Sequence, residues 1–76
     1  MTKEQEQLLK IVTTKMPFGK YEGRILTDLP VSYLEWFNRN GFPQGTLGTQ
    51  LSLVLTLKSN GMEEIISGLK KVAQNG

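Results

Sequence analysis

Apolar residues recur at intervals of three and four near the start of the chain, with polar residues between them. This spacing places them on one face of an amphipathic helix. Thr2, followed three residues later by Gln5, has the spacing of a capping box, which marks a helix start. Pro17 cannot continue a helix and disfavours helical backbone just before it. The pattern predicts a first helix over residues 3–14, whose apolar face is formed by Leu8, Leu9, Ile11 and Val12.

Two later segments have the same helical spacing. Asp28 is the expected N-cap of a second helix, with Pro30 in its first turn and Gly41 ending it after Asn40. Its apolar positions are Tyr33, Leu34, Trp36 and Phe37, and Phe42 is expected to pack back on the helix end. A final helix is predicted over residues 62–74, with an apolar face of Ile65, Ile66, Leu69, Val72 and Ala73.

The segment 51–57 has leucine at every second position, with Ser52, Val54 and Thr56 between, a period that also fits a half-buried strand. Three features favour a helix. Leucine is a better helix former than strand former, Thr46 can act as an N-cap, and the Asn60-Gly61 pair is a typical helix end. We therefore predict a helix here and keep the strand as the alternative.

The segment 16–26 is predicted to form two short extended pieces around a turn at residues 19–23, with residues 24–26 as the return strand. Gly19 and Gly23 can adopt a positive φ at little cost, which favours a hairpin. The expected fold class is a small α+β domain, mostly α with a short β-hairpin. It has about four helices, the hairpin lies between the first two, and residues 1–76 form a single domain.

Composition excludes several kinds of site. The 76 residues include no cysteine and no histidine, so the usual zinc ligands, an imidazole base and a thiol nucleophile are all missing. We therefore expect no enzyme activity, no metal and no cofactor. The absence of cysteine suits a reducing compartment, and the polar residues 1–7 do not resemble a secretory signal. With no apolar run long enough to span a membrane, the predicted location is cytoplasmic.

The net charge of +2 is small, but its distribution is uneven. Residues 10–24 contain four basic residues and one acidic residue, which gives this segment a net charge of +3. The basic residues are Lys10, Lys15, Lys20 and Arg24, and the acidic residue is Glu22. The excess positive charge therefore lies in and just before the segment Phe18-Gly-Lys-Tyr-Glu-Gly-Arg24.

The order of these short motifs resembles that of a small bacterial family of unknown function, labelled putative quorum-sensing-regulated virulence factor. The matching residues are Met16-Pro-Phe-Gly-Lys-Tyr-Glu-Gly-Arg24, then Leu29-Pro30, Tyr33-Leu34, Trp36-Phe37, Gly41-Phe42-Pro43, Gly45, Leu47 and Gly48. The likeness covers roughly residues 10–65. Glu22 is a departure, because a basic or neutral residue is expected there. The label implies regulation by cell density in some member and implies no mechanism.

A shorter pattern, Phe-Gly-Lys-x-x-Gly followed by Leu-Pro and Tyr-Leu-x-Trp, also resembles a segment appended to some bacterial DNA exonucleases of the proofreading type. The exonuclease core itself is missing from this chain. The resemblance implies a nucleic-acid context and no catalytic role.

These observations predict a binding module that contacts single-stranded nucleic acid through the 18–24 turn. Glycine backbone and cations suit phosphate, and aromatic rings suit stacking on bases. The candidate binding residues are Lys15, Phe18, Gly19, Lys20, Tyr21, Gly23, Arg24, Tyr33 and Trp36. The competing interpretation makes the glycines a structural turn and the aromatics part of the core.

The alternative function is a protein-interaction or regulatory adaptor. It would use the aromatic helix and the leucine-rich stripe between Leu47 and Leu57, which is wide enough to form a homodimer surface. The chain could therefore be a monomer or a homodimer, with either nucleic acid or a protein as its partner, and with no membrane association expected.

Overall fold

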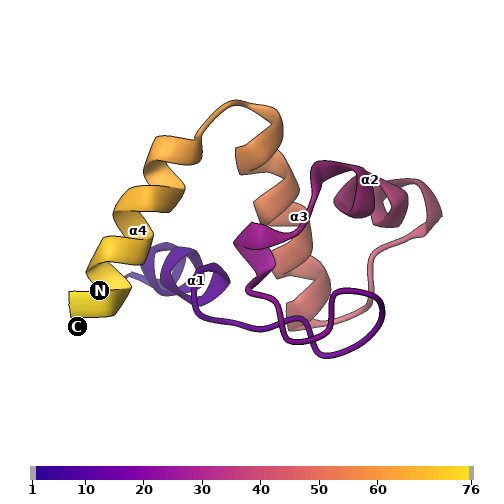
Figure 1. Cartoon of the computed structure of the whole chain (residues 1–76), viewed down its shortest axis with the longest axis horizontal. Helices are drawn as coiled ribbons and strands as arrows, with labels where there is room; N and C mark the ends of the chain where they lie inside the picture. The colour runs from indigo at the N-terminus through magenta and orange to yellow at the C-terminus, as the bar shows by residue number, and fades with distance from the viewer. Residues whose placement is uncertain (1, 76) are drawn as a thin grey trace.

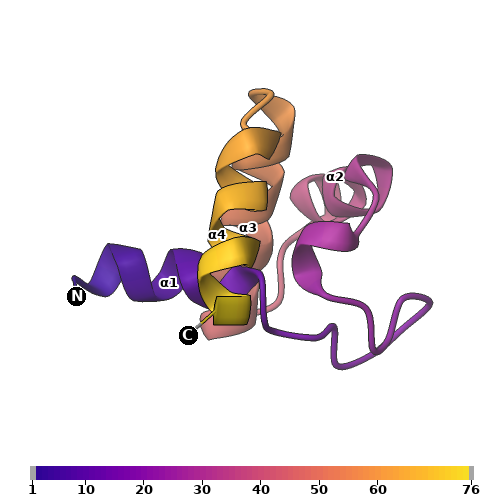
Figure 2. The same ribbon diagram turned by 60° about the vertical axis from the view of Figure 1, so that its left-hand side comes forward.

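A computed structural model describes residues 2–75, which form four α-helices and one short 3₁₀ turn. The helices are α1 (Lys3–Ile11), α2 (Val31–Asn40), α3 (Thr46–Ser59) and α4 (Glu63–Asn75), and the 3₁₀ turn η1 is Leu26–Asp28. α3 stands at the centre, with α2 on one side and α4 on the other (Figure 1). α1 lies across the pair formed by α3 and α4 (Figure 2).

The hydrophobic core forms around α3, which contacts α1, α2, α4 and η1. Leu51 and Val54 of α3 have no exposed surface, and Leu57 is also buried. The other buried apolar residues are Ile11, Val12, Met16, Leu26, Leu29, Leu34, Phe37 and Ile66. The leucine-rich stripe considered above as a dimer surface is therefore largely used inside the domain, because its remaining leucines pack against the same core.

α1 begins as the sequence predicts and ends earlier. The Thr2 hydroxyl accepts a hydrogen bond from the Gln5 backbone N–H at 3.2 Å, and the Gln5 side chain accepts one from the Thr2 N–H at 3.0 Å. This capping box is confirmed. The helix stops at Ile11, where the backbone N–H groups of Val12 and Thr13 bond to carbonyls three residues back, at Leu9 and Lys10, and no longer to carbonyls four residues back. The predicted end at residue 14 was therefore about one turn too late.

The ambiguous segment 51–57 is helical, so the helix prediction is confirmed and the strand alternative is wrong. Gly45, not Thr46, occupies the N-cap position, and Thr46 is the first helical residue. The longest helix has 14 residues. No helix in the part of the chain described by the structure is long and apolar enough to cross a membrane.

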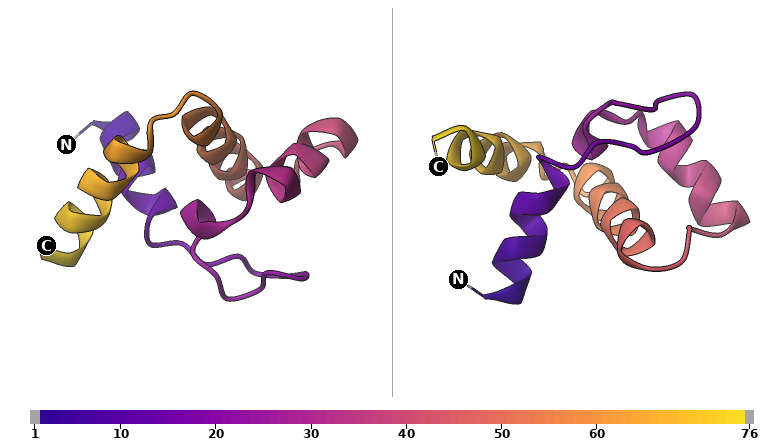
Figure 3. Two further views of the ribbon diagram at one scale, coloured as in Figure 1. Left: turned by 45° about the horizontal axis from the view of Figure 1, so that its top comes forward. Right: turned by 90° about the horizontal axis from the view of Figure 1, so that it is seen from below.

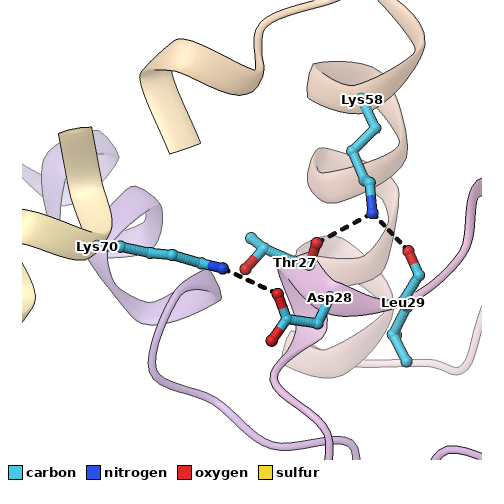
Figure 4. A network of polar contacts seen from close by, with 5 residues as sticks. All are labelled: Thr27, Asp28, Leu29, Lys58 and Lys70. Atoms are coloured by element: carbon cyan, nitrogen blue, oxygen red, sulfur yellow. Dashed lines mark hydrogen bonds and ion pairs between the residues drawn. The ribbon is translucent and has the colours of Figure 1, made fainter. Parts of the chain in front are cut away.

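α2 starts later than predicted, and Asp28 is not its N-cap. Pro30 holds that position and no side chain caps the helix, while Asp28 lies in η1. The Asp28 carboxylate instead accepts a hydrogen bond from the Lys70 ammonium of α4 at 2.8 Å (Figure 4). At the other end Gly41 stops α2 as predicted, with a φ of 104° and its N–H bonded to the Phe37 carbonyl.

The predicted β-hairpin is wrong, and with it the α+β fold class: residues 2–75 contain no strand and form an all-α domain. The two sides are joined by one isolated antiparallel bridge, between Lys15 and Ile25, and by a bond from the Gly23 N–H to the Met16 carbonyl. Pro17 has no N–H with which to extend the ladder. Beyond it the chain turns twice, through bonds from the Glu22 N–H to the Gly19 carbonyl and from the Arg24 N–H to the Tyr21 carbonyl. Within residues 19–24 these turns take the place of a longer ladder.

The predicted final helix is confirmed, with bounds within a residue of those expected. Its apolar face is split in two. Ile66 is buried, and Leu69 and Ala73 pack against the core, but Ile65 and Val72 are exposed. The face of α4 that packs on the core is therefore narrower than the apolar face predicted from the sequence.

Candidate binding groove

The segment between α1 and η1 forms a compact loop over residues 16–24 that runs beside α2 (Figure 3). Backbone bonds close it: the Met16 N–H donates to the Arg24 carbonyl at 2.7 Å, and the Gly23 N–H donates to the Met16 carbonyl at 2.8 Å. Gly19 and Gly23 both have positive φ, at 79° and 89°, a conformation that glycine adopts at little cost. The Met16 side chain is buried and ties the loop to the core.

The loop and the exposed side of α2 enclose an open groove of about 620 Å³, which we call the aromatic groove. The loop contributes Phe18, Gly19, Lys20 and Tyr21, and α2 contributes Ser32, Tyr33, Trp36 and Phe37. Trp36 is 51% exposed and Phe18 is 41% exposed, which is high for such large apolar side chains. The groove therefore offers aromatic surface to a ligand.

The rings of the groove pack edge to face around Phe37, which is itself buried. The centroid of Phe37 lies 5.2 Å from those of both Tyr33 and Trp36, with interplanar angles of 84°. Tyr21 meets Tyr33 at 4.7 Å in the same type of contact. Such pairs favour fixed ring orientations. Trp36 is therefore held on a rigid base although half of its surface is exposed.

Two cations lie against the ring of Tyr21. The Lys20 ammonium nitrogen is 5.6 Å from the ring centroid and the Arg24 guanidinium carbon is 5.5 Å from it. Among residues 2–75, one ion pair has its nitrogen and oxygen within 4 Å, and it joins Lys70 to Asp28. No described carboxylate therefore forms an ion pair with Lys20 or Arg24. Of the four cations counted over residues 10–24, Lys20 and Arg24 thus lie at the edge of the groove, over an aromatic ring, and Lys10 and Lys15 do not line it.

Tyr33 connects the loop to α2. A Cβ placed on Gly19 would lie 3.1 Å from the Tyr33 hydroxyl oxygen, so glycine gives this side chain its room. Burial raises the pKa of the Tyr33 hydroxyl above its ordinary value, and the charge of a Tyr21 phenolate nearby raises it further. Tyr33 therefore favours its neutral form in the folded protein.

This shift predicts a loss of stability at high pH. A pKa that is higher in the folded state adds stability below the unfolded value of about 10, and this stability is lost as pH rises through the folded value. We expect the free energy of unfolding, measured with urea, to fall as the pH rises above about 10. The fall should be shallower in Tyr33→Phe, because this variant lacks the Tyr33 hydroxyl. The titration of lysines contributes equally to both proteins. Equal slopes in the two proteins would contradict the assignment.

The structure brings six of the nine candidate residues to one groove: Phe18, Gly19, Lys20, Tyr21, Tyr33 and Trp36. Arg24 reaches the same place through its contact with Tyr21. Lys15 and Gly23 do not line the groove; Lys15 is exposed in the bridge to Ile25, and Gly23 closes the loop.

Sequence reasoning missed two groove residues, Ser32 and Phe37. Ser32 precedes Trp36 by four residues, and this spacing on a helix could have placed it on the same face. Phe37 was assigned to the core, where it does lie, but its ring also forms part of the groove wall. As for metal-binding chemistry, no group of three or more potential ligands occurs among residues 2–75.

Comparison with known proteins shows which family the chain resembles. Residues 4–69 match the family described as "Putative quorum-sensing-regulated virulence factor". The chain belongs to this family. The match to this family spans all the groove residues and the whole of α1 except its first residue.

Two curated relatives of the chain are both called "Uncharacterized protein YpeB", one from Escherichia coli strain K12 and one from Escherichia coli O157:H7. Each is 48% identical to the chain over 69 residues, which cover 90% of this chain and 96% of the relative. No solved structure matches the chain. The family resemblance predicted from the motifs is thus confirmed, and it assigns no biochemical activity.

Proposed function

We propose that this chain is a non-enzymatic binding module whose aromatic groove holds single-stranded nucleic acid. In this proposal a base stacks on the exposed indole of Trp36. Lys20 and Arg24 neutralise phosphates on either side of that base. The observation that carries the proposal is one groove containing a half-exposed indole and a tyrosine ring with two cations against it.

The chemistry of the groove supports a single strand over a duplex. Bases of a single strand can leave their stack and lie on an aromatic side chain, a contact worth about 1–3 kcal/mol per base. In a duplex the faces of the bases are already covered by their neighbours. The resemblance of the Phe18–Gly23 motif to a segment appended to DNA exonucleases adds support of a separate kind.

The charges at the groove predict how binding depends on salt. Each phosphate neutralised on a single strand contributes a slope of about −0.7 to the plot of log affinity against log salt concentration. Two contacts, from Lys20 and Arg24, should therefore contribute about −1.4.

Trp36 provides a direct measurement, because it is the single tryptophan of the chain. We expect its fluorescence to be quenched when an oligonucleotide of about eight nucleotides is added at low salt. Replacing Lys20 and Arg24 together with alanine should weaken binding at low salt and make the salt dependence shallower. Trp36→Ala has no tryptophan fluorescence, so its binding is measured by backbone amide NMR. We expect it to lose about tenfold in affinity.

The matched control removes the same charge elsewhere. Lys3 and Lys71 are exposed, lie on α1 and α4, and do not line the groove. A variant with alanine at both positions should bind almost as the native protein does. The proposal is wrong if the oligonucleotide neither quenches Trp36 nor shifts amide signals of residues 18–24 at low salt. It is also wrong if the two double variants lose affinity equally.

A second candidate function is a protein-interaction adaptor that uses the same groove. The large exposed apolar surfaces of Phe18 and Trp36 favour it, since such surfaces often mark protein contacts. The Lys20 and Arg24 double variant separates the two functions. It should release a nucleic acid, whereas a protein partner held by apolar contacts should remain bound and lose affinity with Trp36→Ala.

A further inference from the structure

A second pocket lies where α1 meets the beginning of α3, and it shares no lining residue with the aromatic groove. Its volume is about 540 Å³. Gln7 and Lys10 line it from α1, and Gly45, Thr46, Thr49, Gln50 and Leu53 line it from α3 and the residue before it. Leu53 is the one apolar side chain among these lining residues.

The first turn of α3 brings free hydrogen-bond donors to the pocket. Gly45 holds the N-cap position, and no side chain accepts a hydrogen bond there. The first bond of the helix runs from the Thr49 N–H to the Gly45 carbonyl at 3.3 Å. The N–H groups of the preceding turn thus have no acceptor within the helix, and they carry the positive end of its dipole.

Gln50 gives an independent indication that something binds here. Its side chain is only 7% exposed and it lines the pocket. Helical side chains lean toward the N-terminus of their helix, so the Gln50 amide lies over the first turn of α3. None of the side-chain hydrogen bonds within residues 2–75 involves this amide. Although the residue as a whole is buried, its amide atoms keep some exposed surface, so the amide is free to bond to a ligand in the pocket.

α1 adds a cation to these donors. Gln7 and Lys10 are three residues apart and lie on the same side of the helix, facing the pocket. None of the described residues that line the pocket is acidic. We propose that this pocket binds an oxyanion of phosphate size, held by the first-turn N–H groups of α3, the Gln50 amide and the Lys10 ammonium. The ligand chemistry is that of a phosphate group, either free or part of a larger molecule.

Inorganic phosphate added to the full chain tests the proposal by backbone amide NMR. We expect saturable shifts of the Thr46, Leu47 and Gly48 amides and of the Gln50 side-chain NH₂. Chloride at the same ionic strength should produce no such shifts. Lys10→Ala should weaken phosphate binding by about tenfold, because it removes one charged hydrogen bond. Lys3→Ala, on the same helix and away from the pocket, should leave it unchanged.

Gln50→Leu separates ligand binding from a structural role. If the amide serves a ligand, leucine should leave the Tm without phosphate unchanged or higher, and should abolish the rise in Tm that phosphate causes. If the amide serves the fold, the Tm without phosphate should fall and the phosphate effect should persist, which would overturn the proposal. Absence of any phosphate-specific shift would overturn it as well.

The source of the phosphate group requires one more titration. An oligonucleotide without terminal phosphates contains only phosphodiesters, and shifts of the same three amides would assign the pocket to a nucleic-acid backbone. Shifts with inorganic phosphate alone would assign it to a free or terminal phosphate. Since both ligands are read at α3 amides, this result is independent of the quenching of Trp36 in the aromatic groove.

Discussion

Replacing Gly48 with alanine is expected to lower the free energy of unfolding by about 3 kcal/mol. A Cβ at this position would lie 1.8 Å from the carbonyl oxygen of Pro43 and 3.0 Å from its carbonyl carbon. Both atoms belong to the backbone, so the clash cannot be relieved by turning a side chain. α3 and the turn after α2 would have to separate. The Tm should fall by roughly 12–24 °C for a domain of this size.

Gly68→Ala is the matched control for this substitution. Gly68 also lies within a helix, but a Cβ there would meet nothing within 4 Å. Alanine is favoured over glycine in helices by up to about 1 kcal/mol, so this variant should be unchanged or more stable. Urea unfolding of the two variants measures the difference. Similar stability for Gly48→Ala and the native protein would show that α3 and Pro43 are not in close contact.

Replacing Lys58 with methionine is expected to lower the free energy of unfolding by about 2 kcal/mol. The Lys58 ammonium donates hydrogen bonds to the carbonyl oxygens of Thr27 at 3.0 Å and Leu29 at 2.6 Å (Figure 4). This partly buried contact ties η1 to the last turn of α3. Methionine keeps an unbranched apolar stem but leaves both carbonyls without their donor.

Lys70→Met provides the comparison, because it removes the same charge from the neighbouring ion pair. The side chains of Lys70 and Asp28 are 37% and 49% exposed, and exposed pairs contribute at most about 1 kcal/mol. The loss of stability should therefore be smaller than for Lys58→Met, and it should shrink as salt is added. Equal losses for the two variants would show that the Lys58 hydrogen bonds do not stabilise the fold.

The elements predicted correctly are those whose determinants lie close together in the sequence. The capping box of α1 needs only Thr2 and Gln5, and Gly41 ends α2 through its own backbone conformation. The leucine-rich segment became α3 because leucine favours a helix over a strand. In each case the deciding interaction spans four residues or fewer, so it can be recognised in the sequence.

One error concerns an interaction between distant segments, and the others concern how a short segment folds back on itself. Asp28 resembles an N-cap, but its partner is Lys70, 42 residues away. The glycines at 19 and 23 do have the positive φ that a hairpin turn uses. Their positions in the sequence do not show that residues 19–24 would form two successive turns, each closed by a backbone hydrogen bond. Gly48 likewise looks like an ordinary weak point in a helix until the Pro43 carbonyl is placed against it.

The candidate site was predicted in part for the same reason. The residues of the 18–24 loop are contiguous, so their chemistry can be recognised as one motif. That Trp36 and Tyr33 face this loop depends on how α2 packs, which the sequence pattern does not specify. Phe37 shows the difficulty best: a single ring is buried in the core and still forms part of the groove wall.

The closure of the 16–24 loop separates the residues that set its shape from those that set its chemistry. Its closing bonds, from Met16 to Arg24 and from Gly23 to Met16, join backbone atoms only. The exposed side chains of Lys20 and Glu22 take no part in them. Substitutions at Lys20, which lines the groove, can therefore change its charge while the same backbone frame holds the aromatic rings in place.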